Sequence, residues 1–377
     1  GIVADANTAT NVHVVRNAKL FAKNGMKVRF CGEHSKNNVP QKYEGFSFSF
    51  TKPIKGKGKV RGAKWNWEQI TGFGMTAAIK REIKRDKPDI IILYDPASIV
   101  TFLRINRLCR KMRMRLVVEV TEWPEGEDFH GKDKILWWQR NFRKSYLDKK
   151  CGYQIVISKL LEQHYRKQGN HVLLLPPIYQ EQDFVKEGQI SRVHMPLKLV
   201  FAGTLAKKDY LLSMINAVQY INQDDEKRIE FTIIGPSKEE LNAKAMIESS
   251  KCIKIMGRLP HEEVLRIVAD ADFSVLLREN KRYAKAGVST KFSEAMCLGI
   301  PSICTSVGGT DLYVEDGVNG ILVLDNEVET IVSALDRILS MDMDCIQTMK
   351  KNALKTAQEH FFDSKYNEQI KAFFNEI

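Results

Sequence analysis

Short runs of apolar residues alternate, in the second half of the chain, with longer stretches whose apolar positions recur every three or four residues. The runs are LKLVFAG (197–203), RIEFTIIG (228–235), CIKIMG (252–257) and ADFSVLL (271–277). Because each run is nearly continuous in apolar character and rich in β-branched or aromatic residues, it predicts a parallel strand buried on both faces. The stretches between the runs, such as HEEVLRIVADA, predict helices. This alternation predicts a doubly wound α/β domain over 197–360.

The first half of the chain repeats the alternation. GIVAD, NVHVVRNAKLFAKNG and MKVRFCG predict a strand, a helix and a strand, and KPDIIILYD, RLVVEVTE and GYQIVIS add further buried strands. We therefore expect another Rossmann-like domain over 1–175. The segment 176–196 opens with two prolines and is predicted to link the two domains. Gly1 is not an initiator methionine, so we expect a short piece of the first strand to precede it.

The sequence AGVSTKFSEAMCLGIP (286–301) carries candidate chemistry. It predicts a small flexible loop that leads into a helix, whose first backbone N–H groups and dipole favour an anion. The loop residues Gly287, Val288, Ser289 and Thr290 would surround a diphosphate, and an adjacent lysine and a glutamate one turn on would add a positive charge and a carboxylate for the two hydroxyls of a ribose. An ordinary helix cap at Ser289 or Thr290 followed by a surface glutamate would give the same pattern.

Glycines and polar residues also follow the predicted strands of the second half. They are Gly203 with Thr204, Gly235, Gly257 with Arg258, and Arg278 with Glu279. Ligands of doubly wound sheets bind at the carboxyl ends of the strands. The sequence therefore predicts one ligand site that combines these strand ends with the 286–301 loop.

Between Leu199 and Val323 four segments occur in a characteristic order: VFAGTLAKKDYLLSMINAV, FTIIGPS, IKIMGRLPHEEVLRIVADADFSVLL and STKFSEAMCLGIPSICTSVGGTDLYVEDGVNGILV. They resemble the donor-binding half of a retaining glycosyltransferase of the GT-B fold, family 4 (glycosyl transferases group 1). The resemblance implies an α/β fold of two Rossmann-like, doubly wound domains that face a central cleft, with a C-terminal helix (361–377) that returns to the N-terminal domain. It also implies a metal-independent hexosyltransferase (EC 2.4) that uses a nucleoside-diphosphate sugar, with UDP more frequent than GDP. No cofactor is implied, because the nucleotide sugar is a substrate.

The resemblance assigns roles to residues of the donor half. Lys208 would contact the donor diphosphate, Glu294 would hold the ribose, and Arg258 and Leu259 would frame the base. Together with Lys291 and the helix amides, Lys208 would stabilise the leaving phosphate, which would itself accept the proton of the acceptor hydroxyl in a front-face reaction.

Two positions depart from the family pattern. Ala286 stands where members carry a first glutamate that touches the transferred sugar, and Thr204 stands where an arginine usually follows the glycine of the first strand. The sugar contact is therefore missing or comes from elsewhere in the chain, and Gly308, Gly309 and Thr310 are further candidates for reading sugar hydroxyls.

The predicted first domain offers acceptor contacts at its strand ends. Thr8, Thr10 and Asn11 follow its first predicted strand, and Glu122 and His130 lie in TEWPEGEDFHG, after the strand that ends near residue 120. His130 would hydrogen-bond the transferred sugar or take up a proton, and a solvent-exposed loop histidine fits the sequence equally well. His130 thus joins Lys208, Lys291 and Glu294 as a catalytic candidate.

The formal net charge of +12 calls for an anionic partner. Three basic stretches, 46–67, 104–115 and 137–150, mix lysines and arginines with aromatic residues, which suits peripheral contact with an anionic membrane at its inner face. Solvated helix faces of a basic protein would explain the same charge. Nucleic acid is disfavoured, since no nucleic-acid-binding motif accompanies the charge. Seven cysteines without a CxxC pair predict reduced thiols in a cytoplasmic protein.

The most probable activity on these grounds is transfer of a sugar to a saccharide or lipid-linked saccharide acceptor in surface polysaccharide or glycoconjugate synthesis. Two alternatives remain open at this stage. A UDP-sugar epimerase of the same fold would turn over its donor without an acceptor, and a degenerate partner subunit would bind nucleotide sugar without catalysis.

Overall fold

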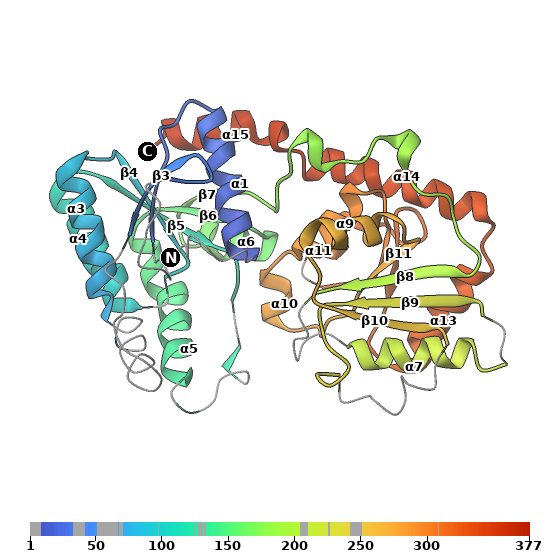
Figure 1. The fold of residues 1–377 in the computed structure, drawn as a ribbon. Coiled ribbons are helices and arrows are strands. Elements are labelled where there is room, and N and C mark those ends of the chain that lie inside the picture. Colours follow the sequence, from blue (N-terminus) through green and yellow to red (C-terminus); the bar gives the residue numbers. More distant parts are fainter. Residues whose placement is uncertain are drawn as a thin grey trace. The chain divides into compact units, whose positions relative to one another are not determined.

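The computed structural model describes residues 9–32, 42–50, 67, 71–96, 98–123, 125–126, 131, 133–203, 210–224, 227–241, 251–307 and 309–377. The chain divides into two compact units: unit 1 comprises 1–178 and 366–377, and unit 2 comprises 179–365. Both units are built on parallel strands with helices packed against them (Figure 1). The predicted α/β fold class is confirmed.

Unit 2 is built on six parallel strands in the order β10-β9-β8-β11-β12-β13. Their bounds are β8 (Leu197–Ala202), β9 (Ile229–Ile234), β10 (Ile253–Gly257), β11 (Phe273–Leu276), β12 (Ser302–Thr305) and β13 (Gly320–Val323). The first four coincide with the apolar runs of the sequence. Central side chains such as Phe231 and Phe273 are fully buried, which explains why these runs show no alternation of polar and apolar residues.

Helices cover both faces of this sheet. On one face α7 (Leu211–Ile221) packs beside α13 (Val328–Leu339). On the other face lie α9 (His261–Ala269) and α11 (Thr290–Cys297), and α14 (Met343–His360) packs on α11 (Figure 1). Two short helices, α10 (Arg282–Ala286) and α12 (Thr310–Tyr313), lie in the connections.

Unit 1 contains two sheets within its described ranges. The larger one has four parallel strands in sequence order: β4 (Ile90–Tyr94), β5 (Arg115–Val120), β6 (Tyr153–Val156) and β7 (His171–Leu174). In the smaller one β3 (Phe46–Phe50) lies between β1 (Arg29–Gly32), which is parallel to it, and β2 (Lys42–Tyr43), which is antiparallel. The strand predicted at 1–5 lies outside the described residues.

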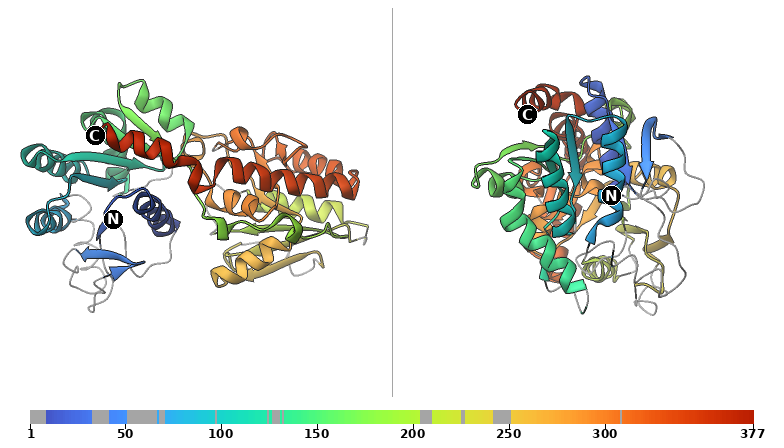
Figure 2. Two further views of the ribbon diagram at one scale, coloured as in Figure 1. Left: turned by 90° about the horizontal axis from the view of Figure 1, so that it is seen from above. Right: turned by 90° about the vertical axis from the view of Figure 1, so that its left-hand side faces the viewer.

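Within the described residues of unit 1, six α-helices frame these strands. They are α1 (Ala9–Lys23), α3 (Phe73–Arg85), α4 (Ile99–Met112), α5 (Asp133–Phe142), α6 (Lys159–Arg166) and α15 (Asn367–Asn375). A π-helical turn, Arg143–Leu147, continues α5. Helix α15 belongs to unit 1, although it is far along the chain from the other helices of that unit (Figures 1 and 2). Its residues Ile370 and Phe373 pack with Leu20 and Val117 in the core, and Asn24 Nδ2 donates to Asn367 Oδ1 at 2.8 Å.

None of the helices within the described ranges combines the length and the apolar character that crossing a bilayer requires.

Candidate functional site

The strand order of unit 2 places the 286–301 loop at a topological switch point. From β8 the chain proceeds outward to β9 and β10, and it then returns to the other side of β8 to form β11, β12 and β13. The order therefore reverses between β8 and β11. In open α/β sheets the connections leave such neighbouring strands in opposite directions, so that ligands bind beyond their carboxyl ends. Gly203 directly follows β8, and α11 follows the connection that leaves β11.

The first turn of α11 has no side-chain cap at its N-terminus. Ser289 occupies the N-cap position with extended backbone angles (φ −72°, ψ 120°), and its hydroxyl makes no capping hydrogen bond. The side chains of Val288 and Ser289 are buried. The structure therefore does not support Ser289 as an ordinary side-chain cap, and the first N–H groups of α11 remain suited to an external acceptor.

Lys291 and Glu294 lie next to each other on α11. The Lys291 Nζ is 3.3 Å from Glu294 Oε2, and their side chains are 42% and 11% exposed. The lysine head is thus open to solvent while the carboxylate is largely enclosed. A cation thus lies beside a sheltered carboxylate within the first turns of a helix that has no side-chain cap. These are the groups that the sequence predicts for a phosphate contact and a ribose contact.

Tyr179 fixes this helix turn from the buried side, and sequence reasoning missed it. Its hydroxyl donates to the Thr290 carbonyl at 3.0 Å and lies 2.8 Å from Ser293 Oγ. Ser293 Oγ in turn contacts the carbonyls of Ser289 and Thr290. Tyr179 and Ser293 are both fully buried. Because Tyr179 falls in the segment predicted as a linker, only the tertiary structure reveals its contact with α11.

Three glycines bring the carboxyl ends of β8, β9 and β10 together. Gly203 N donates to Ile234 O, and Gly235 N donates to Gly257 O at 2.7 Å. Gly235 has a φ of +118°, and a Cβ atom there would lie 1.8 Å from Gly203 O. Only glycine permits this close approach, so Gly203 and Gly235 shape the backbone floor beside the switch point.

Arg258 and Leu259 follow the edge strand β10. Arg258 is largely exposed, and its Nη2 lies 3.5 Å from Oε1 of Glu240, a residue that follows β9. Leu259 packs against the core beneath β8 and β9. Ala286 is fully buried at the end of α10. The position of the first family glutamate is therefore part of the apolar interior, where a carboxylate would be costly. Thr310 is buried, and its hydroxyl bonds to Thr305 O and Val307 O.

Lys208 and Thr204 lie outside the described residues, as do Thr8, His130 and Gly308. Thr10 lies in α1, and Asn11 is buried there rather than open to solvent.

In unit 1, Glu122 is held by Arg140, whose Nη1 lies 3.2 Å from its Oε1, and its carbonyl accepts a hydrogen bond from Lys144 Nζ. This carbonyl contact belongs to a buried charge cluster at the carboxyl ends of β4 and β5. Asp95 follows β4 with an unusual φ of 24° and binds Arg143 Nη2 (2.6 Å) and Lys144 Nζ (3.0 Å).

The same cluster continues to Asp148. Arg143 Nη1 lies 2.6 Å from both Asp148 oxygens, and the Tyr165 hydroxyl donates to Asp148 Oδ2. Burial alone would raise the pKa of Asp95, but Lys144 and Arg143 lower it below its ordinary value. Burial lowers the pKa of Lys144, because it disfavours the charged ammonium group. The sequence predicts a basic surface at 137–150, and this is wrong for Arg143 and Lys144, which are fully buried because two aspartates neutralise them.

A second buried polar group joins α1 to β5. His13 Nε2 lies 2.7 Å from Glu119 Oε1, and Asn17 Nδ2 donates to the same oxygen at 2.7 Å. All three side chains are buried. Glu119 is a charged residue inside the apolar run RLVVEV, and this is the feature of the sequence that indicates a buried polar contact.

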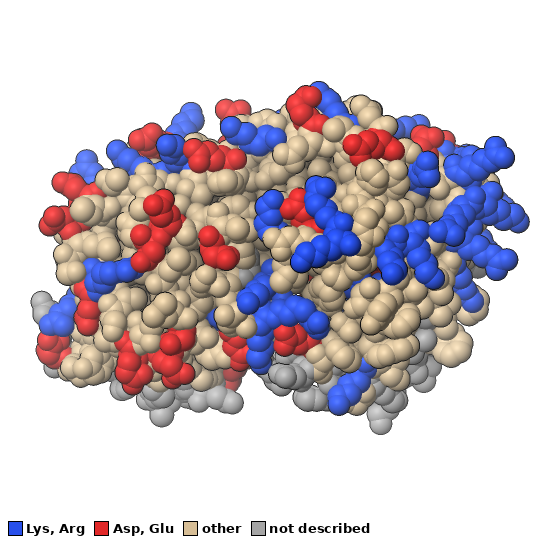
Figure 3. Space-filling model, turned by 180° about the vertical axis from the view of Figure 1, so that it is seen from behind, with Lys and Arg blue, Asp and Glu red and all other residues tan. Residues whose placement is uncertain are grey.

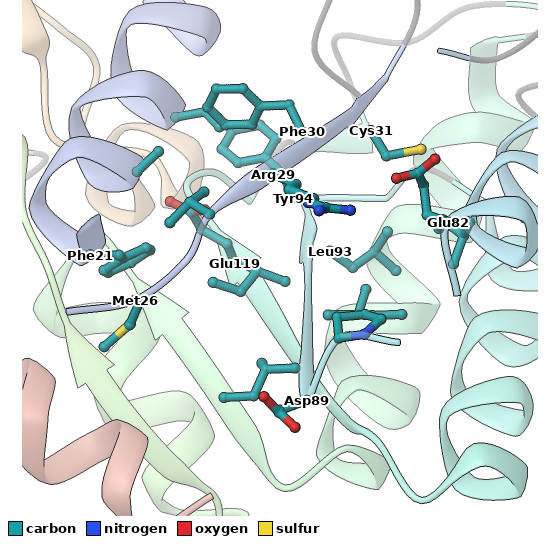
Figure 4. Close-up of a pocket in the computed structure, with 18 of the residues that line it drawn as sticks. Phe21, Met26, Arg29, Phe30, Cys31, Glu82, Asp89, Leu93, Tyr94 and Glu119 are labelled. Carbon is teal, nitrogen blue, oxygen red and sulfur yellow. The ribbon is translucent and has the colours of Figure 1, made fainter. Parts of the chain in front are cut away.

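A cavity of about 630 Å³ lies next to this group in unit 1. Figure 4 shows its walls, which include Arg29 and Phe30 from β1, Leu93 and Tyr94 from β4, and Glu119 from β5. Strands β1 and β4, which belong to different sheets, thus line one space. We do not assign the nucleotide to this cavity, because its lining does not include the 286–301 loop.

A comparison with known protein families gives a match within unit 2. Residues 196–341 match the family Glycosyl transferases group 1. An uncharacterized glycosyltransferase of Methanocaldococcus jannaschii is 24% identical over 255 residues, which cover 65% of this chain and 64% of the relative. The amylovoran biosynthesis glycosyltransferase AmsK of Erwinia amylovora is 25% identical over 44% of this chain and 42% of its own length. These matches span less than two thirds of either relative.

Solved structures extend the likeness to both units. Sucrose-phosphate synthase of Thermosynechococcus elongatus superposes with a TM-score of 0.74 at 15% identity, covering 98% of this chain and 93% of its own. WaaG, a glycosyltransferase involved in lipopolysaccharide biosynthesis, superposes with a TM-score of 0.64 at 15% identity, covering 96% of each chain. Anabaena HepE, in complex with UDP and glucose, superposes with a TM-score of 0.66 at 14% identity, covering 99% of this chain and 98% of its own. The chain therefore has the GT-B fold of two Rossmann-like domains, and its residues 196–341 match the model of the glycosyl transferases group 1 family.

Proposed function

We propose that this chain is a retaining glycosyltransferase that moves a sugar from a nucleoside-diphosphate sugar to a saccharide or lipid-linked saccharide acceptor. The observation that carries the proposal is the start of α11: uncapped amides, a solvent-open lysine and a sheltered glutamate within one helical turn, at the switch point of a doubly wound sheet. The amides and the lysine suit the diphosphate, and the glutamate suits the hydroxyls of the ribose.

The donor fits this turn in one orientation. The diphosphate lies at the amides of 288–290 and against Lys291, while Glu294 accepts hydrogen bonds from the two ribose hydroxyls. Since the head of Lys291 is open to solvent, its contact with Glu294 can be exchanged for a contact with a donor phosphate. Gly203 and Gly235 lie beside this turn, and the absence of a side chain at Gly235 lets the ends of β8 and β9 approach each other.

UDP is the proposed nucleotide, with GDP as the second choice. Anabaena HepE, which shares the fold, has been solved with UDP-glucose and with UDP and glucose. The base would lie near Arg258 and Leu259 beyond β10.

The chemical step needs charge stabilisation rather than an enzymic nucleophile. Departure of the nucleoside diphosphate builds negative charge on phosphate, and fixed N–H dipoles and lysines stabilise that charge. Lys291 and the α11 amides supply this within unit 2, Lys208 is proposed to assist, and His130 is proposed to contact the transferred sugar. We propose that no divalent metal is required.

The acceptor is proposed to bind unit 1 near Glu122, at the carboxyl ends of β4 and β5. Two relatives are named as an amylovoran biosynthesis and a putative colanic acid biosynthesis glycosyltransferase. Their names support our proposal of a saccharide acceptor in surface polysaccharide or glycoconjugate synthesis.

A nucleotide-binding subunit without catalysis is the second candidate. It is favoured by one observation: Ala286 is buried where the family places a glutamate against the transferred sugar.

The test is a thermal-shift titration with UDP, GDP and ADP and with their glucose conjugates, with and without EDTA. We expect selective stabilisation by one nucleoside diphosphate that EDTA does not alter. Addition of UDP-glucose and acceptor extract then separates the two candidates, because only a transferase releases UDP at a rate that depends on the extract. No shift with any nucleotide would contradict both.

A further inference from the structure

One outer face of unit 1 is formed by α3, α4 and α5, which lie side by side in the right-hand view of Figure 2. Two contacts hold them together. Arg104 of α4 stacks over the Phe73 ring of α3, 3.9 Å from its centroid, and the Ile99 N–H at the start of α4 donates to Gln139 of α5 at 3.1 Å. The three helices are therefore neighbours, and we call the surface formed by their exposed side chains the α3–α5 face.

Large apolar side chains stand out of the α3–α5 face. They are Phe73, Val100, Leu103, Ile135, Trp138 and Tyr146, each more than one third exposed. Trp138 is 53% and Tyr146 is 58% exposed, and Phe142 joins them in a row with ring centroids 5.4 and 5.3 Å apart. Rings that stack on one another are fixed in an outward orientation at little cost in side-chain entropy. An apolar row of this kind needs an apolar partner.

Cations surround these apolar side chains. Together α3 and α4 carry eight lysines and arginines and one glutamate. Lys84, Arg107 and Lys111 are among the exposed ones. Lys and Arg side chains gather over unit 1 at the right-hand edge of Figure 3, which corresponds to the α3 and α4 side in Figure 1. The net charge of these two helices, +7 from eight cations and one anion, opposes pairing of this face with its own copy.

We propose that the α3–α5 face docks on the surface of an anionic lipid bilayer. A bilayer offers negative head groups for the cations and, a few ångströms deeper, an apolar layer for Trp138, Leu103 and Ile135. Tryptophan and tyrosine favour that boundary because their rings are apolar at one end and polar at the other. Three adjacent helices form a broad surface rather than a groove, which suits a membrane better than a single peptide.

The α3–α5 face differs from the membrane-contacting surface that the sequence predicted. Arg143 and Lys144 are buried and do not contribute, and most of the basic stretch 46–67 lies outside the described residues. The face rests instead on α3, which the sequence did not single out, on the outer side of α4, and on the aromatic row of α5. It rests on the proposed function only where the acceptor is taken to be lipid-linked.

Flotation with vesicles tests the proposal. Phosphatidylcholine vesicles with 30 mol% phosphatidylglycerol are compared with vesicles of phosphatidylcholine alone, at low and high salt. We expect the wild type to float only with the anionic vesicles and to be released by salt. The triple variant Lys84→Gln, Arg107→Gln, Lys111→Gln is expected to lose about 100-fold in partitioning, from the interfacial attraction of three cations. Leu103→Gln with Trp138→Gln should also lose binding.

Matched controls lie on unit 2. Lys251→Gln, Lys254→Gln, Arg266→Gln removes three exposed charges, and Leu212→Gln with Leu324→Gln removes two exposed apolar side chains. Both are expected to bind like the wild type. Thermal shift with UDP is measured on every protein, so that loss of the nucleotide site is distinguished from loss of the membrane surface.

Three results would overturn the proposal. They are failure of the wild type to float with anionic vesicles, equal flotation with neutral vesicles, and equal losses in the unit 2 controls. Light scattering that shows a dimer which Trp138→Gln dissociates would assign the face to self-association instead.

Discussion

The hydroxyl of Tyr179 lies 2.8 Å from Oγ of Ser293, although 114 residues separate them in the chain. This contact joins the first segment of unit 2 to the buried side of α11, and it continues to the Thr290 carbonyl. The turn that is proposed to hold the donor phosphates is therefore fixed from behind. A binding turn that is already in place does not lose conformational entropy when the ligand arrives.

Tyr179→Phe tests this support. Loss of the hydroxyl leaves Ser293 and the Thr290 carbonyl with one partner fewer, which costs about 1–2 kcal/mol of stability for buried hydrogen bonds. We expect a fall in Tm of a few degrees and a UDP affinity reduced less than about tenfold. Tyr220→Phe, at an exposed position of α7, is the control for loss of a tyrosine hydroxyl. Wild-type stability and affinity in Tyr179→Phe would show that the contact supports neither.

Lys291→Met should weaken the binding of the phosphates and leave the binding of the nucleoside unchanged. The lysine is placed at the diphosphate and not at the base, so calorimetry should show UDP affinity reduced about tenfold through the loss of a charge-assisted hydrogen bond, with uridine affinity unchanged. Lys285→Met, at an exposed lysine of α10, is the matched control. Equal losses for UDP and uridine would remove Lys291 from the phosphate contact.

The charge cluster of unit 1 should respond strongly to loss of one member. Asp95→Asn leaves Lys144 and Arg143 without one of their carboxylates, and breaking such a buried pair costs about 3–5 kcal/mol. The double variant Asp95→Asn, Lys144→Met should recover part of that loss. All five tryptophans belong to unit 1, so urea unfolding followed by tryptophan fluorescence reports on this unit directly. A loss below about 1 kcal/mol, the range of exposed pairs, would contradict the burial of the cluster.

The same cluster predicts that the unfolding free energy of unit 1 depends on pH. Lys144 and Arg143 hold the pKa of Asp95 below its ordinary value against the effect of burial. The unfolded state therefore binds the proton more readily. The stabilisation by Asp95 is present above the ordinary carboxyl range near pH 4 and is lost as the pH falls further. Below that range the difference in unfolding free energy between wild type and Asp95→Asn should shrink. A difference that stays constant from pH 6 to pH 3 would contradict this assignment.

Alkylation should separate the cysteines by burial. Burial raises the pKa of Cys109 and of Cys31 to about 11 and that of Cys304 to about 12, and Cys345 is the exposed member of the seven. Because the thiolate is the reacting form, iodoacetamide at pH 8 should modify Cys345 first. Peptide mapping by mass spectrometry measures the order, and early labelling of Cys304 would place it outside the core of unit 2.

Local sequence pattern was sufficient for much of unit 2. The runs at 197–203 and 228–235 became β8 and β9, because strands buried on both faces need apolar side chains at every position. The helix start at Ser289 was also predictable, since a small flexible loop followed by an amphipathic stretch marks it within a few residues.

Long-range contacts were not predictable from the pattern. Tyr179 lies in a proline-containing segment, and its partner is in α11. Arg143 and Lys144 read as surface charges, because the aspartate that neutralises both follows a strand almost fifty residues earlier. Burial of a charge depends on such a partner, and a partner distant in sequence leaves no local signal.

The ribose contact of Glu294 offers the most direct test of the donor site. Calorimetry compares UDP with 2′-deoxy-UDP, for the wild type and for Glu294→Ala, with Glu262→Ala on the exposed side of α9 as the control. If Glu294 holds the ribose diol, the wild type and the control should bind UDP at least tenfold more tightly than the deoxy analogue, the range of a hydrogen bond to a charged group. In Glu294→Ala that preference should vanish. A preference that persists unchanged in Glu294→Ala, or a wild type that binds neither nucleotide, would contradict the assignment of the donor site to α11.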